Sequence, residues 1–127
     1  ALKMAGLTPA DIDHINAHAT STPVGDRAEI AALRNAFGKA LSGIPISATK
    51  SATGHMLGAA GGVESIFSAL SVMHDRLPPP LNLENADEDL HDLDFVSGAA
   101  REHHGRHVLC NGFGFGGVNA ALIVSKM

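Results

Sequence analysis

Short apolar runs separated by polar breaks predict alternating strands and helices in the first half of the chain. The runs at 13–17 and 44–48 are typical of strands. Between them, Asp26 is placed to cap a helix that ends at Gly38, because a carboxylate can accept the free N–H groups of a first turn. Residues 1–6 indicate the last turn of a helix closed by Gly6.

The longest apolar stretch, at 55–75, predicts a helix that is apolar almost all round. It is interrupted by Glu64, so it indicates a buried helix rather than a membrane span. Such a helix needs to be covered on most sides, and one short chain does not provide enough packing surface for that. We therefore expect exposed apolar surface along this helix or at the sheet edge. The consecutive prolines at 78–80 end the helix and favour an extended crossing, and the polar residues at 82–91 predict a surface loop.

The last third of the sequence is typical of strands. We expect a short strand at 94–97, a turn at 101–106, and strands at 107–111 and 118–124 joined by the glycine-rich run 112–117. The order β-α-β-α-β-β-β predicts an α/β fold with a mixed sheet, packed helices and antiparallel final strands. Together with the helix end that opens the chain, it leaves open that these residues are one half of a larger two-part enzyme.

Composition narrows the class of protein. A chain of 127 residues suits one domain, and 45% hydrophobic with 17% charged residues is ordinary for a globular protein. The net charge of −4, without a Lys/Arg cluster, argues against nucleic acid or an anionic membrane as partner. A single cysteine excludes an internal disulfide framework, and no secretory signal is seen, so we expect a cytoplasmic protein.

Several candidate motifs give way to simpler interpretations. Gly112, Gly114 and Gly117 match a dinucleotide-binding spacing, but no helix and acidic residue follow, so a hairpin turn or a loop against a ligand fits better. The histidines at 103, 104 and 107 lack acidic or thiolate partners at ligand spacing, so no metal site is expected. Cys110 lies in an apolar strand, which indicates a buried, inert thiol.

Two histidines remain as candidates for chemistry, because each follows a predicted strand at a point rich in small and hydroxyl residues. His18 precedes Thr20 and Thr22, and His55 follows Lys50 by five residues. Neutral imidazoles donate one N–H each, so such a pair suits stabilisation of a developing oxyanion. Lys50 supplies positive charge, and Glu64 is placed to balance it.

These motifs resemble the C-terminal half of an elongating β-ketoacyl-[acyl-carrier-protein] synthase, a member of the thiolase-like condensing enzymes. The similarity lies in three segments: Asn16-Ala-His-Ala-Thr-Ser-Thr-Pro23, Lys50 to His55, and Asn111 to Asn119. It implies a thiolase-like layered fold, with residues 1–127 forming the C-terminal ketoacyl-synthase domain of a parent whose N-terminal half is absent here. It also implies decarboxylative condensation of an acyl thioester with malonyl carried on acyl carrier protein, in fatty-acid elongation.

The resemblance implies roles for particular residues. His18 and His55 hydrogen-bond the malonyl thioester oxygen, and Lys50 supports them with Glu64 in the same network. Thr20 and Thr22 line the phosphopantetheine tunnel. Phe115 resembles the gatekeeper of the site, with Phe113 packed beside it. No cofactor or metal is implied, acyl carrier protein is the partner, and the full-length parent is expected to be a homodimer.

Three departures from the family pattern matter. The nucleophilic cysteine belongs to the N-terminal half, so we expect no condensation by this chain alone. Ala19 and Gly112 stand where the family commonly has glycine and serine, and a positive φ at Ala19 would be strained. Two alternatives stay open: an inactive half that binds carrier protein or a complementary half, and a fragment of a polyketide ketosynthase. The sequence does not define acyl chain length.

Overall fold

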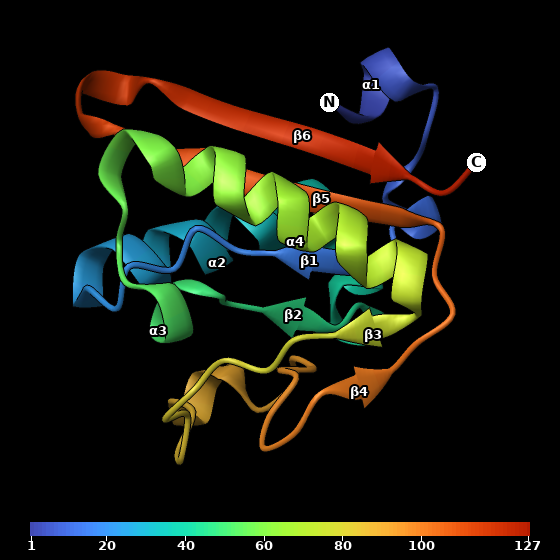
Figure 1. Cartoon of the computed structure of the whole chain (residues 1–127). Coiled ribbons are helices and arrows are strands. Elements are labelled where there is room, and N and C mark those ends of the chain that lie inside the picture. The colour runs from blue at the N-terminus through green and yellow to red at the C-terminus, as the bar shows by residue number, and fades with distance from the viewer.

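The computed structural model describes residues 1–127 and has a mixed four-stranded sheet at its centre (Figure 1). The strand order is β2-β1-β5-β6. Strand β1 (His14–Asn16) is parallel to β2 (Ile46–Ser47) and to β5 (His107–Phe113), and β6 (Asn119–Ser125) is antiparallel to β5. The predicted α/β class and the antiparallel final strands are confirmed.

Helix α2 (Pro23–Phe37) packs on one face of this sheet through Leu33 and Phe37. These side chains join a core of ten buried apolar residues: Ile12, Ile15, Ala17, Leu33, Phe37, Leu41, Ile44, Ile46, Leu93 and Leu109. The predicted end at Gly38 is correct, but the predicted N-cap is wrong. Thr22 caps the helix by accepting the N–H of Gly25 at 3.2 Å, because Pro23 is already suited to the first helical position.

Helix α4 (Ala60–His74) covers the other face and crosses in front of β1 and β5 in Figure 1. Its buried side includes Glu64, Ser68 and Ser71, whereas Ile66 and Met73 are 60% and 66% exposed. The expectation of exposed apolar surface is confirmed, since the single sheet covers only one side of the helix. The helix also begins later than predicted, because residues 57–59 form a 3-10 turn (Leu57–Ala59).

The remaining elements are short. They are α1 (Leu2–Ala5), closed by Gly6 at φ 69° as predicted, α3 (Lys50–Thr53), and a second sheet of β3 (Arg76–Leu77) and β4 (Arg101–Glu102). Two expectations need correction. The strand at 94–97 reduces to one bridge between Phe95 and Ile46, because β2 offers only two residues for pairing. The turn at 101–106 begins with β4, because Arg101 and Glu102 pair with β3.

The glycine-rich run forms the hairpin between β5 and β6. The N–H of Gly114 donates to the carbonyl of Val118 at 2.8 Å, and Gly116 and Gly117 have φ values of 78° and 82°. These left-handed conformations are readily adopted only by glycine. The hairpin places Phe113 and Phe115 at the end of the sheet where β1 also ends. No helix in the structure has the length and apolar character needed to span a membrane.

Candidate active site

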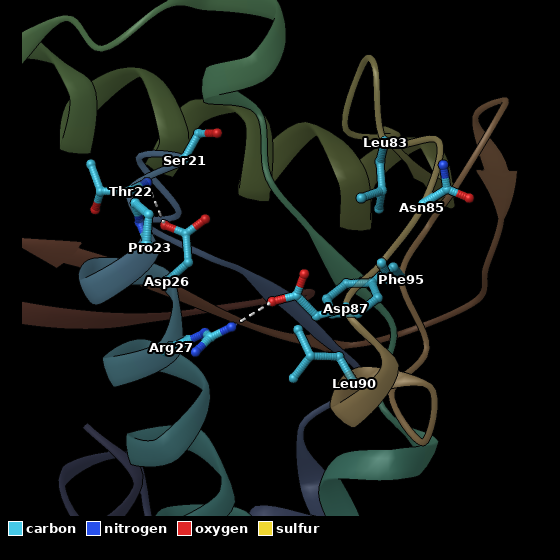
Figure 2. A pocket seen from close by; sticks show the side chains of 11 residues that line it. Ser21, Thr22, Pro23, Asp26, Arg27, Leu83, Asn85, Asp87, Leu90 and Phe95 are labelled. Atoms are coloured by element: carbon cyan, nitrogen blue, oxygen red, sulfur yellow. Dashed lines mark hydrogen bonds and ion pairs between the residues drawn. The ribbon is translucent and has the colours of Figure 1, made fainter.

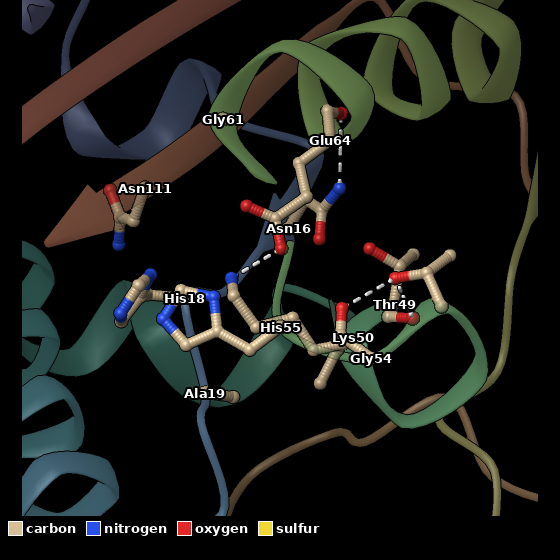
Figure 3. Close-up of polar contacts among 12 residues, drawn as sticks. Asn16, His18, Ala19, Thr49, Lys50, Gly54, His55, Gly61, Glu64 and Asn111 are labelled. Atoms are coloured by element: carbon tan, nitrogen blue, oxygen red, sulfur yellow. Dashed lines mark hydrogen bonds and ion pairs between the residues drawn. The ribbon is translucent and has the colours of Figure 1, made fainter. Parts of the chain in front are cut away.

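His18 and His55 lie together although 37 positions separate them in the sequence (Figure 3). His18 follows the carboxyl end of β1, and His55 follows α3, which begins shortly after the carboxyl end of β2. Because β1 and β2 are parallel, both loops leave the sheet at the same edge. The ring centroids are 5.6 Å apart with an interplanar angle of 89°, and the ring of Phe113 lies 5.5 Å from that of His18.

The two histidines line a cleft of about 830 Å³. Thr20 and Thr22 line its side, and their hydroxyl oxygens are 3.2 Å apart. The hairpin closes another side with Phe113 and Phe115, although the Phe115 side chain is fully exposed in this chain. All eight residues singled out from the sequence lie in or against this cleft: His18, Thr20, Thr22, Lys50, His55, Glu64, Phe113 and Phe115.

Glu29 holds the backbone that carries His18, and the sequence analysis did not assign it this position. Its carboxylate accepts the N–H of His18 at 2.9 Å, the N–H of Ala19 at 2.8 Å and the side-chain amide of Asn111 at 3.1 Å. Glu29 is only 4% exposed. The signal was present in the helix pattern, since Glu29 occupies the same stripe as Leu33 and Phe37 at a spacing of four residues.

The backbone beside His18 is strained. Ala19 has φ 31° and Ser21 has φ 61°, and both values are unusual for residues with a side chain. The positive φ considered for Ala19 is therefore present. The Glu29 carboxylate holds this conformation by accepting the N–H groups of two successive peptides, those of His18 and Ala19.

Lys50 and Glu64 form an ion pair beneath the histidines, with side chains 5% and 2% exposed. The second oxygen of Glu64 has no partner in the structure. Asn16 lies next to it and donates its side-chain amide to the Glu64 carbonyl at 3.2 Å, as drawn in Figure 3. The predicted charge balance between Lys50 and Glu64 is confirmed, and Asn16 joins α4 to the end of β1.

The hydrogen bonds indicate which ring nitrogen carries the proton. His55 Nδ1 accepts the N–H of Leu57 at 3.3 Å, so the neutral ring carries its proton on Nε2. His18 Nδ1 is buried without a partner, which disfavours a proton there and favours the same tautomer. Burial lowers the pKa of His18, and the charge of Lys50 lowers it further, so the ring is neutral near pH 7.

Other candidates from the sequence do not join this site. Cys110 is buried in β5, and burial raises its pKa, as expected of an inert thiol. His104 lies between Asp75 and Glu102 on the surface, at 3.3 Å from each. No group of three or more metal-ligating side chains is assembled in the structure.

A second cavity, of about 460 Å³, lies between the start of α2 and the segment 83–95 (Figure 2). Arg27 and Asp87 form an ion pair of 3.3 Å across it, with both side chains mostly exposed. Exposed pairs of this kind contribute little stability. The cavity contains no histidine or cysteine, whereas both imidazoles line the larger cleft.

Comparison with known proteins identifies the family. Residues 1–84 match the family model described as β-ketoacyl synthase, C-terminal domain. The chain belongs to the β-ketoacyl synthase family. This confirms the resemblance inferred from the three sequence motifs.

The curated relatives of this β-ketoacyl synthase chain are much longer than the chain itself. It is 48% identical over 126 residues to 3-oxoacyl-[acyl-carrier-protein] synthase 2 of Coxiella burnetii, covering 99% of this chain and 30% of that protein. The identity to the protein of the same name from Staphylococcus aureus strain COL is 44%, with the same coverage. The chain therefore spans about a third of the length of these relatives.

Solved structures agree with the fold. A β-ketoacyl synthase from Burkholderia phymatum STM815 matches all of this chain and 30% of its own, with a TM-score of 0.91 and 38% identity. A ketosynthase described as bound to a hexaketide, in complex with its type II polyketide acyl-carrier protein, matches with a TM-score of 0.94 and 31% identity. The layered α/β fold expected from the resemblance is thus shared with ketosynthases.

Proposed function

We propose that this chain supplies the decarboxylation half of a condensing site in fatty-acid elongation. The observation that carries the proposal is the approach of the His18 and His55 rings to 5.6 Å at the wall of the cleft. The neutral form of each ring carries its proton on Nε2 and can donate it, and burial lowers the pKa of His18, which favours the neutral form of that ring.

The proposed step is the loss of carbon dioxide from malonyl held as a thioester on acyl carrier protein. The bond between the carboxylate carbon and the α-carbon breaks, and its electron pair forms an enolate with charge on the thioester oxygen. N–H groups of His18 and His55 stabilise that charge. Lys50, fixed by Glu64, adds positive charge beneath the imidazoles.

The rest of the cleft suits the arm that carries the malonyl group. Thr20 and Thr22 offer hydroxyls to the amides of phosphopantetheine, and Phe113 and Phe115 offer apolar cover at the opposite wall. The exposed ring of Phe115 and the glycines beside it suit a gate that moves over the substrate. The chemistry proposed needs no metal or organic cofactor, and a cytoplasmic location remains a prediction.

Condensation is proposed for the full-length parent, as a homodimer, and not for these 127 residues alone. The enolate carbon must attack an acyl thioester held on a cysteine. The single cysteine of this chain, Cys110, is 4% exposed and its pKa is raised by burial. A chain that does not condense acyl groups by itself fits both this proposal and the alternative of an inactive half that binds carrier protein or a complementary half. The other alternative is that the chain is a fragment of a polyketide ketosynthase. In that case the full-length parent would turn over polyketide donors rather than fatty acyl donors.

A chimera tests the proposal. This chain replaces the matching segment of the Coxiella burnetii synthase 2, and the release of carbon dioxide from malonyl-carrier protein and the formation of β-ketoacyl product are measured separately. His18→Ala and His55→Ala should each lower decarboxylation at least a hundredfold, as for loss of an oxyanion donor. His91→Ala, an exposed histidine away from the cleft, is the matched control and should retain the activity of the chimera.

Two outcomes contradict the proposal. One is a folded chimera whose decarboxylation is unaffected by loss of His18 and His55, or absent altogether. The other is efficient carbon–carbon bond formation by the isolated 127-residue chain, which would require a nucleophile that the proposal does not assign.

A further inference from the structure

His14 lies on β1, four residues before His18, and is 1% exposed. Its Nε2 is 2.9 Å from the hydroxyl oxygen of Ser47, and that hydroxyl donates to the carbonyl of Pro78 at 2.7 Å. Because the hydroxyl proton is committed to Pro78, Ser47 accepts a hydrogen bond from His14. Nε2 therefore carries the imidazole proton, and one chain of hydrogen bonds joins β1, β2 and the segment after β3.

The other ring nitrogen of His14, Nδ1, has no acceptor to which a proton could be donated. Nδ1 is buried without a hydrogen-bond partner. A proton there would place an unpaired donor and a full charge in the interior. Burial, with smaller contributions from the charges of His103 and Arg101, accordingly lowers the pKa of His14 to about 3.

The ionisable groups around His14 offer no acceptor to its Nδ1. Arg101 of β4 is paired with Asp94, and β2 carries no ionisable side chain. Asp13 accepts the N–H groups of Arg106 and His107. The other ionisable side chains on the elements packed around β1 are Glu64 and His74 of α4, His107 and Cys110 of β5, and His103 after β4, whose buried Nε2 is also without a partner.

The segment that follows Pro78 leads to the candidate site. The N–H of Leu81 donates to the hydroxyl of Ser51 at 2.7 Å, directly after Lys50. Residues 80–83 line a cavity of about 260 Å³ together with Lys50 and His55. The position of this segment therefore affects the packing around Lys50 and His55.

We propose that His14, Ser47 and Pro78 form a proton-operated latch. Neutral His14 holds the segment 78–83 against Lys50 and His55, and protonation of Nδ1 releases it. The latch is a property of the fold, and only its effect on decarboxylation rests on the proposed function. At low pH the segment 78–83 is therefore released from Lys50 and His55 before the sheet itself unfolds.

Residue-resolved amide exchange of the 127-residue chain tests the latch without any activity assay. Rates are corrected for intrinsic exchange and compared between pH 7.5 and 5. The open population reported by the Leu81 amide should rise about thirtyfold over this interval, since His14 takes up a proton only when released. Amides in β5 should keep their protection.

Two variants and one control make the result specific. His14→Gln keeps an N–H donor but cannot be protonated in this range, so exchange at Leu81 should become independent of pH. Ser47→Ala removes the middle link and should open the segment at every pH. His74→Gln, at an exposed position on α4, should behave as the unmodified chain. A pH slope that persists in His14→Gln overturns the latch, as does loss of protection in β5 equal to that at Leu81.

Discussion

The Glu29 carboxylate accepts the backbone N–H of His18 at 2.9 Å, so a buried acid on helix α2 fixes the strand end that presents a candidate catalytic imidazole. The same carboxylate accepts the N–H of Ala19, and thus holds a residue with φ 31°. Glu29 is a positioning residue in this arrangement, because it acts on His18 only through the backbone.

Replacing Glu29 by Gln should destabilise the chain by about 1–3 kcal/mol, because one acceptor oxygen becomes a donor that faces a backbone N–H. Urea unfolding measures the change. Glu84→Gln, the same change at an exposed position, is the matched control and should stay within about 0.5 kcal/mol. Equal effects at both positions would contradict the role given to Glu29.

Ala19→Gly should stabilise the chain by about 1 kcal/mol. Relief of the positive φ favours the folded state by about 1–2 kcal/mol, and the added freedom of the unfolded chain offsets part of it. Ala17→Gly, two residues earlier at a buried position of ordinary φ, should destabilise instead. The pair is compared by thermal unfolding, and a loss of stability in Ala19→Gly would argue against strain at this peptide.

Breaking the ion pair between Lys50 and Glu64 should cost about 3–5 kcal/mol, because the remaining charge is left buried and unpaired. Lys50→Met and Glu64→Leu are each expected to show this loss in denaturant unfolding. The double variant should recover most of it, since no buried charge then remains. Additive losses in the double variant would mean that the two side chains are not coupled.

His18 should titrate below the usual histidine range, because burial and Lys50 both disfavour its charged form. The folded chain then binds fewer protons than the unfolded chain below about pH 6.5, so the part of its stability due to His18 is present above that pH and declines as the pH falls. NMR titration of the imidazole C–H signals measures the midpoint. In Lys50→Met the midpoint should move upward, and an unchanged midpoint would exclude Lys50 as a cause.

The exposed apolar side of α4 should promote self-association of the isolated chain. Ile66→Lys together with Met73→Lys should lower the concentration dependence of the sedimentation coefficient without changing the circular dichroism spectrum, because both side chains are largely exposed. Ile30→Lys serves as a contrasting variant. Ile30 lies on α2 and is half-buried against the core, so this change should disturb the fold. Unchanged association in the double variant would place the contact elsewhere.

Local pattern in the sequence determined the elements and the chemistry they carry. Apolar runs defined the strands at 13–17 and 107–111, and Gly38 marked the end of α2, because strand alternation and helix termination depend on neighbouring residues. The motifs around His18 and His55 identified the family and the candidate cleft. The pairing of Lys50 with Glu64 was also foreseen from charge alone.

Only the tertiary structure decided how these pieces act on one another. The cap at Thr22, the single bridge at Phe95, the inward polar side of α4 and the proton position on His55 each depend on partners that local periodicity does not contain. Glu29 reaches the His18 backbone, and His14 reaches Ser47, only because the fold brings segments together that are distant in the sequence. The physical reason is that a buried polar side chain needs a hydrogen-bond or charge partner. Packing between distant segments determines which partner it has.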